Sequence, residues 1–197
     1  PSYPRYTPTH YLEAANASRG DACFSSTIGD AANDAVLAID RLTLNGVIEN
    51  TRSLIKDKPI TIVHSVGGAN SLPESDACYR AYSYIDDMAT AYLASDLVIA
   101  RSGAITCSEV RALAKYALFI PLPIGNGEQS VNAHHLVEAG RARVLDQKSF
   151  TPSWLLDNMD SMLATSDQFS DLPNFSDLEA AAKIVALAEH QLSAGER

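Results

Sequence analysis

A glycine turn near the middle of the chain is followed by residues that suit phosphate binding. Gly103 comes after the apolar run DLVIA (96–100), and a helical pattern follows it. Glycine allows the backbone to turn tightly, and the amides of Ala104, Ile105 and Thr106 would then open the helix. At that position N–H groups and the helix dipole hold phosphate oxygens. The turn therefore predicts a seat for a pyrophosphate.

One acidic residue lies where it could serve the sugar of a nucleotide. Glu109 stands one turn into the same helix, so its carboxylate could accept hydrogen bonds from both hydroxyls of a ribose. The alternative is structural: Thr106 and Ser108 cap the helix, and Glu109 complements its dipole. Spacing alone leaves both interpretations open.

A second loop carries side chains that suit sugar hydroxyls. Pro123–Gln129 contains two glycines with Asn126, Glu128 and Gln129, and Asn132 follows at the start of the next helix. Amide and carboxylate groups on such a loop can read hydroxyl groups by hydrogen bonding. An ordinary connection from a strand to a helix is the alternative.

Other reactive residue types lack the spacing that their chemistry needs. His134 and His135 are adjacent, so on a helix they would point about 100 degrees apart and could not easily share a metal ion. We expect His64, inside an apolar run, to be a satisfied core histidine, and Cys107 to be a small packed thiol. The chain contains no G-x-G-x-x-G, P-loop or G-x-S-x-G string, which removes the support for dehydrogenase, P-loop and serine hydrolase interpretations.

The elements that would position these loops alternate between short strands and helices. Apolar runs bounded by glycine, proline or polar residues predict strands at Ile60–Val66, Tyr79–Tyr84, Asp96–Ala100, Leu118–Pro121 and Ala142–Leu145. Helical spacing predicts two helices within Asp30–Ile55, divided at Asn45-Gly46, and further helices at Asp86–Leu93, Thr106–Ala114, Ser130–Ala139, Ser153–Ala164 and Ser176–Leu192. This alternation implies an α/β fold with a doubly wound parallel sheet covered on both faces. Ligands of such sheets bind beyond the carboxyl ends of the strands, where both loops would lie.

Composition excludes several classes of function. The 197 residues include 15 Lys and Arg against 24 Asp and Glu, and the net charge of -9 disfavours binding to nucleic acid. No run approaches the roughly 18 to 20 apolar residues of a membrane-spanning helix, so we expect any membrane contact to be peripheral. Three cysteines without paired spacing argue against a disulfide framework or a zinc site and favour a reducing compartment.

Three linked motifs carry a resemblance to a known family. They are YIDDM (84–88), DLVIARSGAITCSEV (96–110) and PLPIGNGEQSVNA (121–133). In this order and at this spacing they resemble the MurG family of UDP-N-acetylglucosamine transferases, which convert lipid I to lipid II in peptidoglycan synthesis. The segment PIGNGEQ (123–129) is similar to the corresponding segment of actinobacterial members. The resemblance implies the Rossmann-like C-terminal half of a two-domain GT-B glycosyltransferase, which binds UDP-N-acetylglucosamine.

The resemblance also implies a role for individual residues. Ile85 would lie against the uracil and offer it backbone hydrogen bonds, while Arg101 and Ser102 would shape the turn before Gly103. Ala104, Ile105 and Thr106 would approach the diphosphate and sugar, and Glu109 would take the ribose hydroxyls. The N-acetylglucosamine hydroxyls would be read by Glu128, Gln129 and Asn132.

The catalytic machinery is expected elsewhere. The family's N-terminal motif GGTGGH is absent from this sequence, so the catalytic residues are expected in an N-terminal acceptor domain, and this chain alone would not turn over. No Asp-x-Asp string is present, which fits a route without a metal or other cofactor. The complete enzyme would meet lipid I as a peripheral protein at the cytoplasmic face of the membrane.

The start of the chain departs from the family pattern. The family's donor domain opens with a strand and a loop written GGSxGA, whose nearest counterpart here is SSTIGDA (25–31), with two glycines missing. We therefore expect a lead-in segment at 1–29 and a donor-binding domain at 30–197. Two alternatives stay open: an inactive module that binds nucleotide sugars, and a GT-B epimerase acting on the UDP-sugar.

Overall fold

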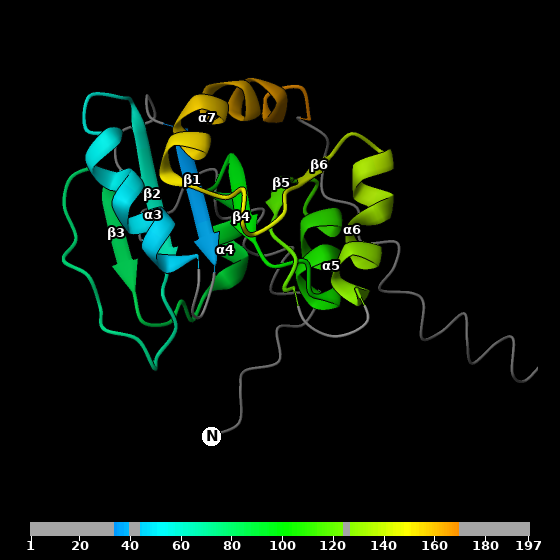
Figure 1. Cartoon of the computed structure of the whole chain (residues 1–197), viewed down its shortest axis with the longest axis horizontal. Coiled ribbons are helices and arrows are strands. Elements are labelled where there is room, and N and C mark those ends of the chain that lie inside the picture. The colour runs from blue at the N-terminus through cyan, green and yellow to red at the C-terminus, as the bar shows by residue number, and fades with distance from the viewer. Residues whose placement is uncertain (1–33, 40–43, 124–126, 170–197) are drawn as a thin grey trace, which may run out of the picture.

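The chain forms one parallel sheet flanked by helices. The computed structural model describes residues 34–39, 44–123 and 127–169 (Figure 1). Its strands are β1 (Asp34–Ile39), β2 (Ile60–Ser65), β3 (Tyr79–Tyr82), β4 (Leu97–Ala100), β5 (Tyr116–Phe119) and β6 (Ala142–Val144). Its helices are α3 (Asn45–Thr51), the short 3-10 helix η1 (Arg52–Leu54), α4 (Met88–Leu93), α5 (Ala104–Ala112), α6 (Glu128–Glu138) and α7 (Pro152–Ser166).

All six strands of this sheet run in the same direction, in the order β3-β2-β1-β4-β5-β6. Their carboxyl ends lie in register, because Ile39 pairs with both Ser65 and Ala100, and Ala100 pairs with Phe119. The chain moves outward from β1 to β3 and then returns to β4 on the other side of β1. The carboxyl ends of β1 and β4 therefore form the switch point at which doubly wound sheets bind ligands.

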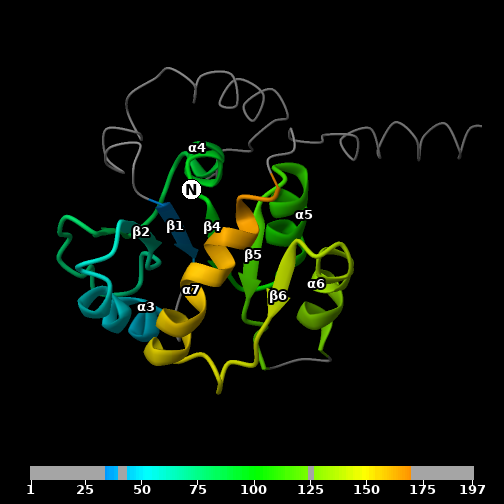
Figure 2. The same cartoon turned by 90° about the horizontal axis from the view of Figure 1, so that it is seen from above.

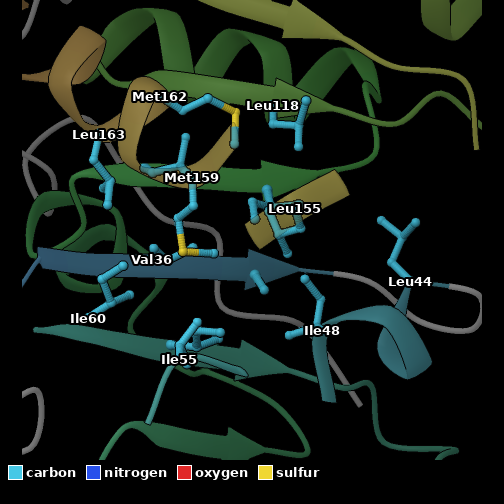
Figure 3. Packing of buried hydrophobic residues seen from close by; sticks show 14 of the residues in the cluster. Val36, Leu44, Ile48, Ile55, Ile60, Leu118, Leu155, Met159, Met162 and Leu163 are labelled. Carbon is cyan, nitrogen blue, oxygen red and sulfur yellow. The ribbon is translucent and has the colours of Figure 1, made fainter. Parts of the chain in front are cut away.

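Helices cover both faces of the sheet (Figure 2). On one face α3 and α7 bury Ile48, Leu155 and Met159 against strand residues that include Val36 and Leu118 (Figure 3). On the other face α4, α5 and α6 contribute a second buried cluster with Tyr92, Cys107, Val110, Ala133 and Leu136. The predicted doubly wound α/β class is confirmed.

The predicted elements between residues 60 and 169 are confirmed with shifts of a few residues at their ends. Helix α7 shows the predicted start, since Thr151 accepts a hydrogen bond from the Trp154 amide at 3.1 Å and Pro152 is the first helical residue. None of the helices in the described part of the chain is long and apolar enough to cross a membrane.

One prediction was wrong: Asp34–Ile39 is a central strand and not a helix. The prediction matched Ala35, Ala38, Ile39 and Leu42 to a helical spacing. In the structure β1 pairs with β2 on one side and β4 on the other, and its side chains alternate between the two buried clusters. A strand buried on both faces has no polar alternation, so its apolar run is indistinguishable from a helix face by periodicity.

Two predicted features lie outside the described residues. They are the lead-in segment at 1–29, with its SSTIGDA string, and the helix at Ser176–Leu192.

His64 is a satisfied core histidine, as predicted. It is fully buried on β2, with Nδ1 2.7 Å from the Tyr79 hydroxyl and Nε2 3.0 Å from Oδ1 of Asn45. The Asn45 amide nitrogen in turn donates to the Val66 carbonyl at 3.0 Å. The network ties the start of α3 to the carboxyl end of β2 and to the first residue of β3.

The packing of α7 predicts a large effect for one core substitution. Leu155 is 0% exposed and lies over the sheet (Figure 3), so Leu155→Ala should lower the free energy of unfolding by about 2 to 5 kcal/mol through lost burial and a residual cavity. Urea denaturation would measure the loss. Leu156→Ala is the matched control: the same atoms are removed from a partly buried neighbour, and the loss should be smaller. Equal losses would contradict the assigned packing of α7.

Candidate functional site

The predicted phosphate seat lies at the switch point of the sheet. Strand β4 ends at Ala100, and α5 begins four residues later at Ala104. Gly103 is the N-cap and supplies no side-chain hydrogen bond to the helix, while the Cys107 amide already donates to the Gly103 carbonyl at 3.0 Å. The amides of the first helical residues, Ala104 to Thr106, precede the intrahelical ladder and are the groups that can bind an anion.

The structure changes the reason for a glycine at position 103. Its φ of -64° and ψ of 151° are ordinary extended values that any residue adopts, so the tight turn does not require glycine. An added Cβ would have Thr106 Oγ1 as its nearest neighbour, 4.0 Å away. The absence of a side chain leaves open space beside the first turn of α5.

Arg101 joins the two predicted ligand loops. Its Nη1 donates to the carbonyl of Ile120 at 3.0 Å and to that of Pro121 at 3.3 Å, both at the end of β5. Ser102 is fully buried, and its hydroxyl has no hydrogen-bond partner within the described residues. These positions fit the predicted role of the two residues in shaping the turn.

Helix α6 is attached to the same turn through its amide side chains. Asn132 Nδ2 donates to the Ser102 carbonyl at 3.1 Å, and Gln129 Oε1 accepts from the Leu122 amide at 2.9 Å. Each of these bonds uses one end of the amide, which leaves Gln129 Nε2 and Asn132 Oδ1 as the groups for a ligand. The structure thus brings the beginnings of α5 and α6 together at the carboxyl edge.

The start of α6 depends on a glycine. Gly127, its N-cap, has a φ of +78°, a left-handed conformation that L side chains rarely adopt. Glu128 is the first helical residue and is exposed. A pocket of about 370 Å³ opens beside this loop, lined by residues that include Leu122, Ser130 and Asp146.

Glu109 lies on α5 with a partner that the sequence analysis missed. Its Oε2 accepts a hydrogen bond from the Tyr92 hydroxyl of α4 at 3.0 Å. Glu109 is partly buried, whereas Tyr92 is 1% exposed. No local spacing signals this pair, because the two residues are 17 positions apart on different helices.

Ile85 lies at the approach to α4. Its side chain is 3% exposed and belongs to the same buried cluster as Tyr92. The predicted backbone contact of Ile85 with a base stays a prediction. Ile105, by contrast, is 76% exposed on the first turn of α5.

The remaining reactive residues behave as predicted. His134 and His135 are exposed on α6, with His134 Nε2 3.2 Å from a carboxylate oxygen of Glu138. Cys107 is 2% exposed, and burial raises its pKa to about 11. This thiol is a packed core group and not an activated nucleophile.

The fold places the chain in the class of doubly wound α/β domains, with the starts of α5 and α6 at the carboxyl edge of the sheet. The family model described as "Glycosyltransferase family 28 C-terminal domain" matches residues 40–190, which is most of the chain. The chain belongs to this family.

Curated relatives share more than a third of their matched residues with this chain. The Corynebacterium glutamicum (strain R) protein named UDP-N-acetylglucosamine--N-acetylmuramyl-(pentapeptide) pyrophosphoryl-undecaprenol N-acetylglucosamine transferase is 36% identical over 148 residues, covering 74% of this chain and 42% of that protein. The Streptomyces coelicolor protein of the same name is 40% identical over 126 residues, covering 61% and 35%. The resemblance to MurG is confirmed, and the chain spans about two fifths of the length of these relatives.

Solved structures confirm the fold. MurG of Acinetobacter baumannii is similar with a TM-score of 0.63 and 24% identity, covering 82% of this chain and 54% of that one. The glycosyltransferase VinC, solved in complex with dTDP, has a TM-score of 0.58 and 19% identity, covering 87% and 46%. The chain therefore has the Rossmann-like C-terminal fold of GT-B glycosyltransferases.

The buried state of Cys107 predicts slow alkylation. With a pKa of about 11, roughly one thiol in a few thousand is ionised near pH 7.5, and the sulfur is also shielded. Iodoacetamide labelling followed by peptide mass spectrometry should show Cys107 reacting at least about tenfold more slowly in the native protein than in urea. The partly buried Cys78, read in the same digest, is the internal comparison. Rapid native labelling of Cys107 would indicate a reactive thiolate at the phosphate turn.

Proposed function

We propose that this chain is the donor-binding half of an inverting glycosyltransferase that takes UDP-N-acetylglucosamine. The observation that carries the proposal is the start of α5 at the switch point, where the amides of Ala104 to Thr106 precede a carboxylate at Glu109. The names of the curated relatives support the identity of the sugar nucleotide. A second domain would supply the acceptor site and the catalytic base.

In this proposal, successive parts of α5 contact successive parts of the nucleotide. Thr106 and Glu109 are three residues apart, or about 4.5 Å along the helix axis. Helical side chains lean toward the helix N-terminus, so the Glu109 carboxylate extends back toward the amides. A diphosphate at the helix start would therefore place its ribose hydroxyls beside this carboxylate.

The chemical contribution of this half is electrostatic. When an acceptor hydroxyl attacks the anomeric carbon, negative charge develops on the departing UDP diphosphate. Fixed N–H groups and the helix dipole at the start of α5 would stabilise that charge without reorganising. Glu128, Gln129 and Asn132, held at the start of α6, would orient the sugar for attack.

In the complete enzyme, the acceptor would be lipid I and the product lipid II. The names of the relatives include a pyrophosphoryl-undecaprenol group, which supports a lipid acceptor. The complete enzyme would meet this acceptor as a peripheral protein at the cytoplasmic face of the membrane. This chain would bind the donor and would need the second domain for transfer.

Loss of the Glu109 carboxylate should weaken nucleotide binding. In isothermal titration of the chain with UDP, Glu109→Ala should reduce affinity by about 1 to 3 kcal/mol, because the ribose hydroxyls lose a charged acceptor. Glu138→Ala is the matched control: it removes the same charge from an exposed position near the end of α6 and should leave UDP affinity unchanged. If Glu109→Ala bound UDP like the unmodified protein, the ribose role would be rejected.

Gln129 should discriminate between nucleotide and nucleotide sugar. Gln129→Ala should weaken UDP-N-acetylglucosamine more than UDP, because only the first ligand carries the hydroxyls that Nε2 would read. The comparison of two ligands on one variant cancels any effect of losing the bond to the Leu122 amide. Ser130→Ala, at the exposed neighbouring position, should affect neither ligand. Equal losses for both ligands would mean that Gln129 does not contact the sugar.

A further inference from the structure

Helix α4 brings a tyrosine hydroxyl to the carboxylate that is proposed to bind the ribose. The Tyr92 hydroxyl donates to Glu109 Oε2 at 3.0 Å. Helices α4 and α5 lie on the same face of the sheet (Figure 2), and both contribute to one buried cluster. The contact therefore joins two helices that pack in the same buried cluster.

The tyrosine is held firmly by its surroundings. Its ring is 1% exposed, and its carbonyl accepts a hydrogen bond from the buried Ser95 hydroxyl at 2.8 Å. Asp87 is the N-cap of α4. Its carboxylate accepts hydrogen bonds from the Thr90 amide at 3.0 Å and from the Thr90 hydroxyl at 2.6 Å. A tyrosine has only two side-chain torsions, so packing at this depth fixes the position of the hydroxyl.

The carboxylate keeps enough acceptor capacity for a ligand. An ionised carboxylate has about four lone-pair directions on its two oxygens, and Tyr92 occupies one of those on Oε2. One donor does not saturate a carboxylate, so the group can also accept from ribose hydroxyls. A glutamate side chain has several rotamers in solution, and one fixed donor restricts this choice before the nucleotide arrives.

We propose that Tyr92 is a positioning residue for the ribose subsite, and this inference rests on the proposed function. Its hydroxyl orients the Glu109 carboxylate toward the ribose hydroxyls. Because Ile85 precedes α4 and packs in the same cluster, α4 also links the backbone that would meet the base to the carboxylate that would meet the ribose. Uracil and ribose recognition would therefore depend on one rigid helix.

Removal of one oxygen atom tests the inference. Tyr92→Phe keeps the buried ring and removes the hydroxyl that donates to Glu109. In isothermal titration, UDP should bind about three- to tenfold more weakly to this variant, the range expected for one hydrogen bond. With 2′,3′-dideoxy-UDP, which lacks the hydroxyls that Glu109 would accept, the unmodified protein and Tyr92→Phe should bind alike. A purely structural role for Tyr92 would weaken both nucleotides equally and would overturn the proposal.

A control and a double substitution complete the test. Tyr79 is another buried tyrosine; it lies on β3, and its hydroxyl pairs with His64. Tyr79→Phe removes this hydroxyl and should leave UDP affinity unchanged. In a Glu109→Ala background, Tyr92→Phe should cause no further loss of UDP affinity, and thermal melting would verify that each variant is folded.

If Glu109→Ala weakens UDP binding but Tyr92→Phe does not, the positioning role is wrong and the proposed function stands. If UDP fails to bind or Glu109→Ala has no effect, the proposed ribose site fails, and the role of Tyr92 fails with it.

Discussion

The parallel pairing of β1 with β4 is the constraint on which the rest of this structure depends. It joins two groups of three strands, β3-β2-β1 and β4-β5-β6, into one sheet. Strand β1 is followed by β2 on one side and β4 is followed by β5 on the other, so the strand order reverses between β1 and β4. The carboxyl edge at such a reversal is where a ligand can reach backbone amides. Without this pairing the start of α5 would be an ordinary helix terminus.

The same pairing explains what the sequence could predict about the fold. Strands such as Ile60–Ser65 and Leu97–Ala100 were recognisable because short β-branched or apolar runs end at glycines or polar turns. Strand β1 was not, because its identity comes from partners on either side that are about 26 and 60 residues away in the chain. Its local pattern equally fits a helix, so the strand at the centre of the sheet was the least predictable from sequence.

The candidate site also has features that the sequence could predict and features that it could not. The turn at Gly103, the amides after it and the carboxylate at Glu109 could be predicted, since they form one continuous segment whose spacing carries the chemistry. The bonds that hold this segment could not. Arg101 reaches the Ile120 carbonyl, Asn132 reaches the Ser102 carbonyl, and Tyr92 reaches Glu109, each across 17 or more residues. Such contacts follow from tertiary packing, which neither periodicity nor capping rules describe.

These long-range bonds bear on how donor binding and sugar transfer would be divided between the parts of the complete enzyme. Several bonds that tie the starts of α5 and α6 together, and one that holds Glu109, join residues within the described part of this chain. Because the bonds to Gln129 and Asn132 each use one end of an amide group, the other end of each amide can serve ligand recognition. In the proposed function, a donor site of this kind is preorganised by its own half of the enzyme. The acceptor site and the base would come from a second domain, so donor affinity and catalytic turnover would be properties of different parts of the complete protein.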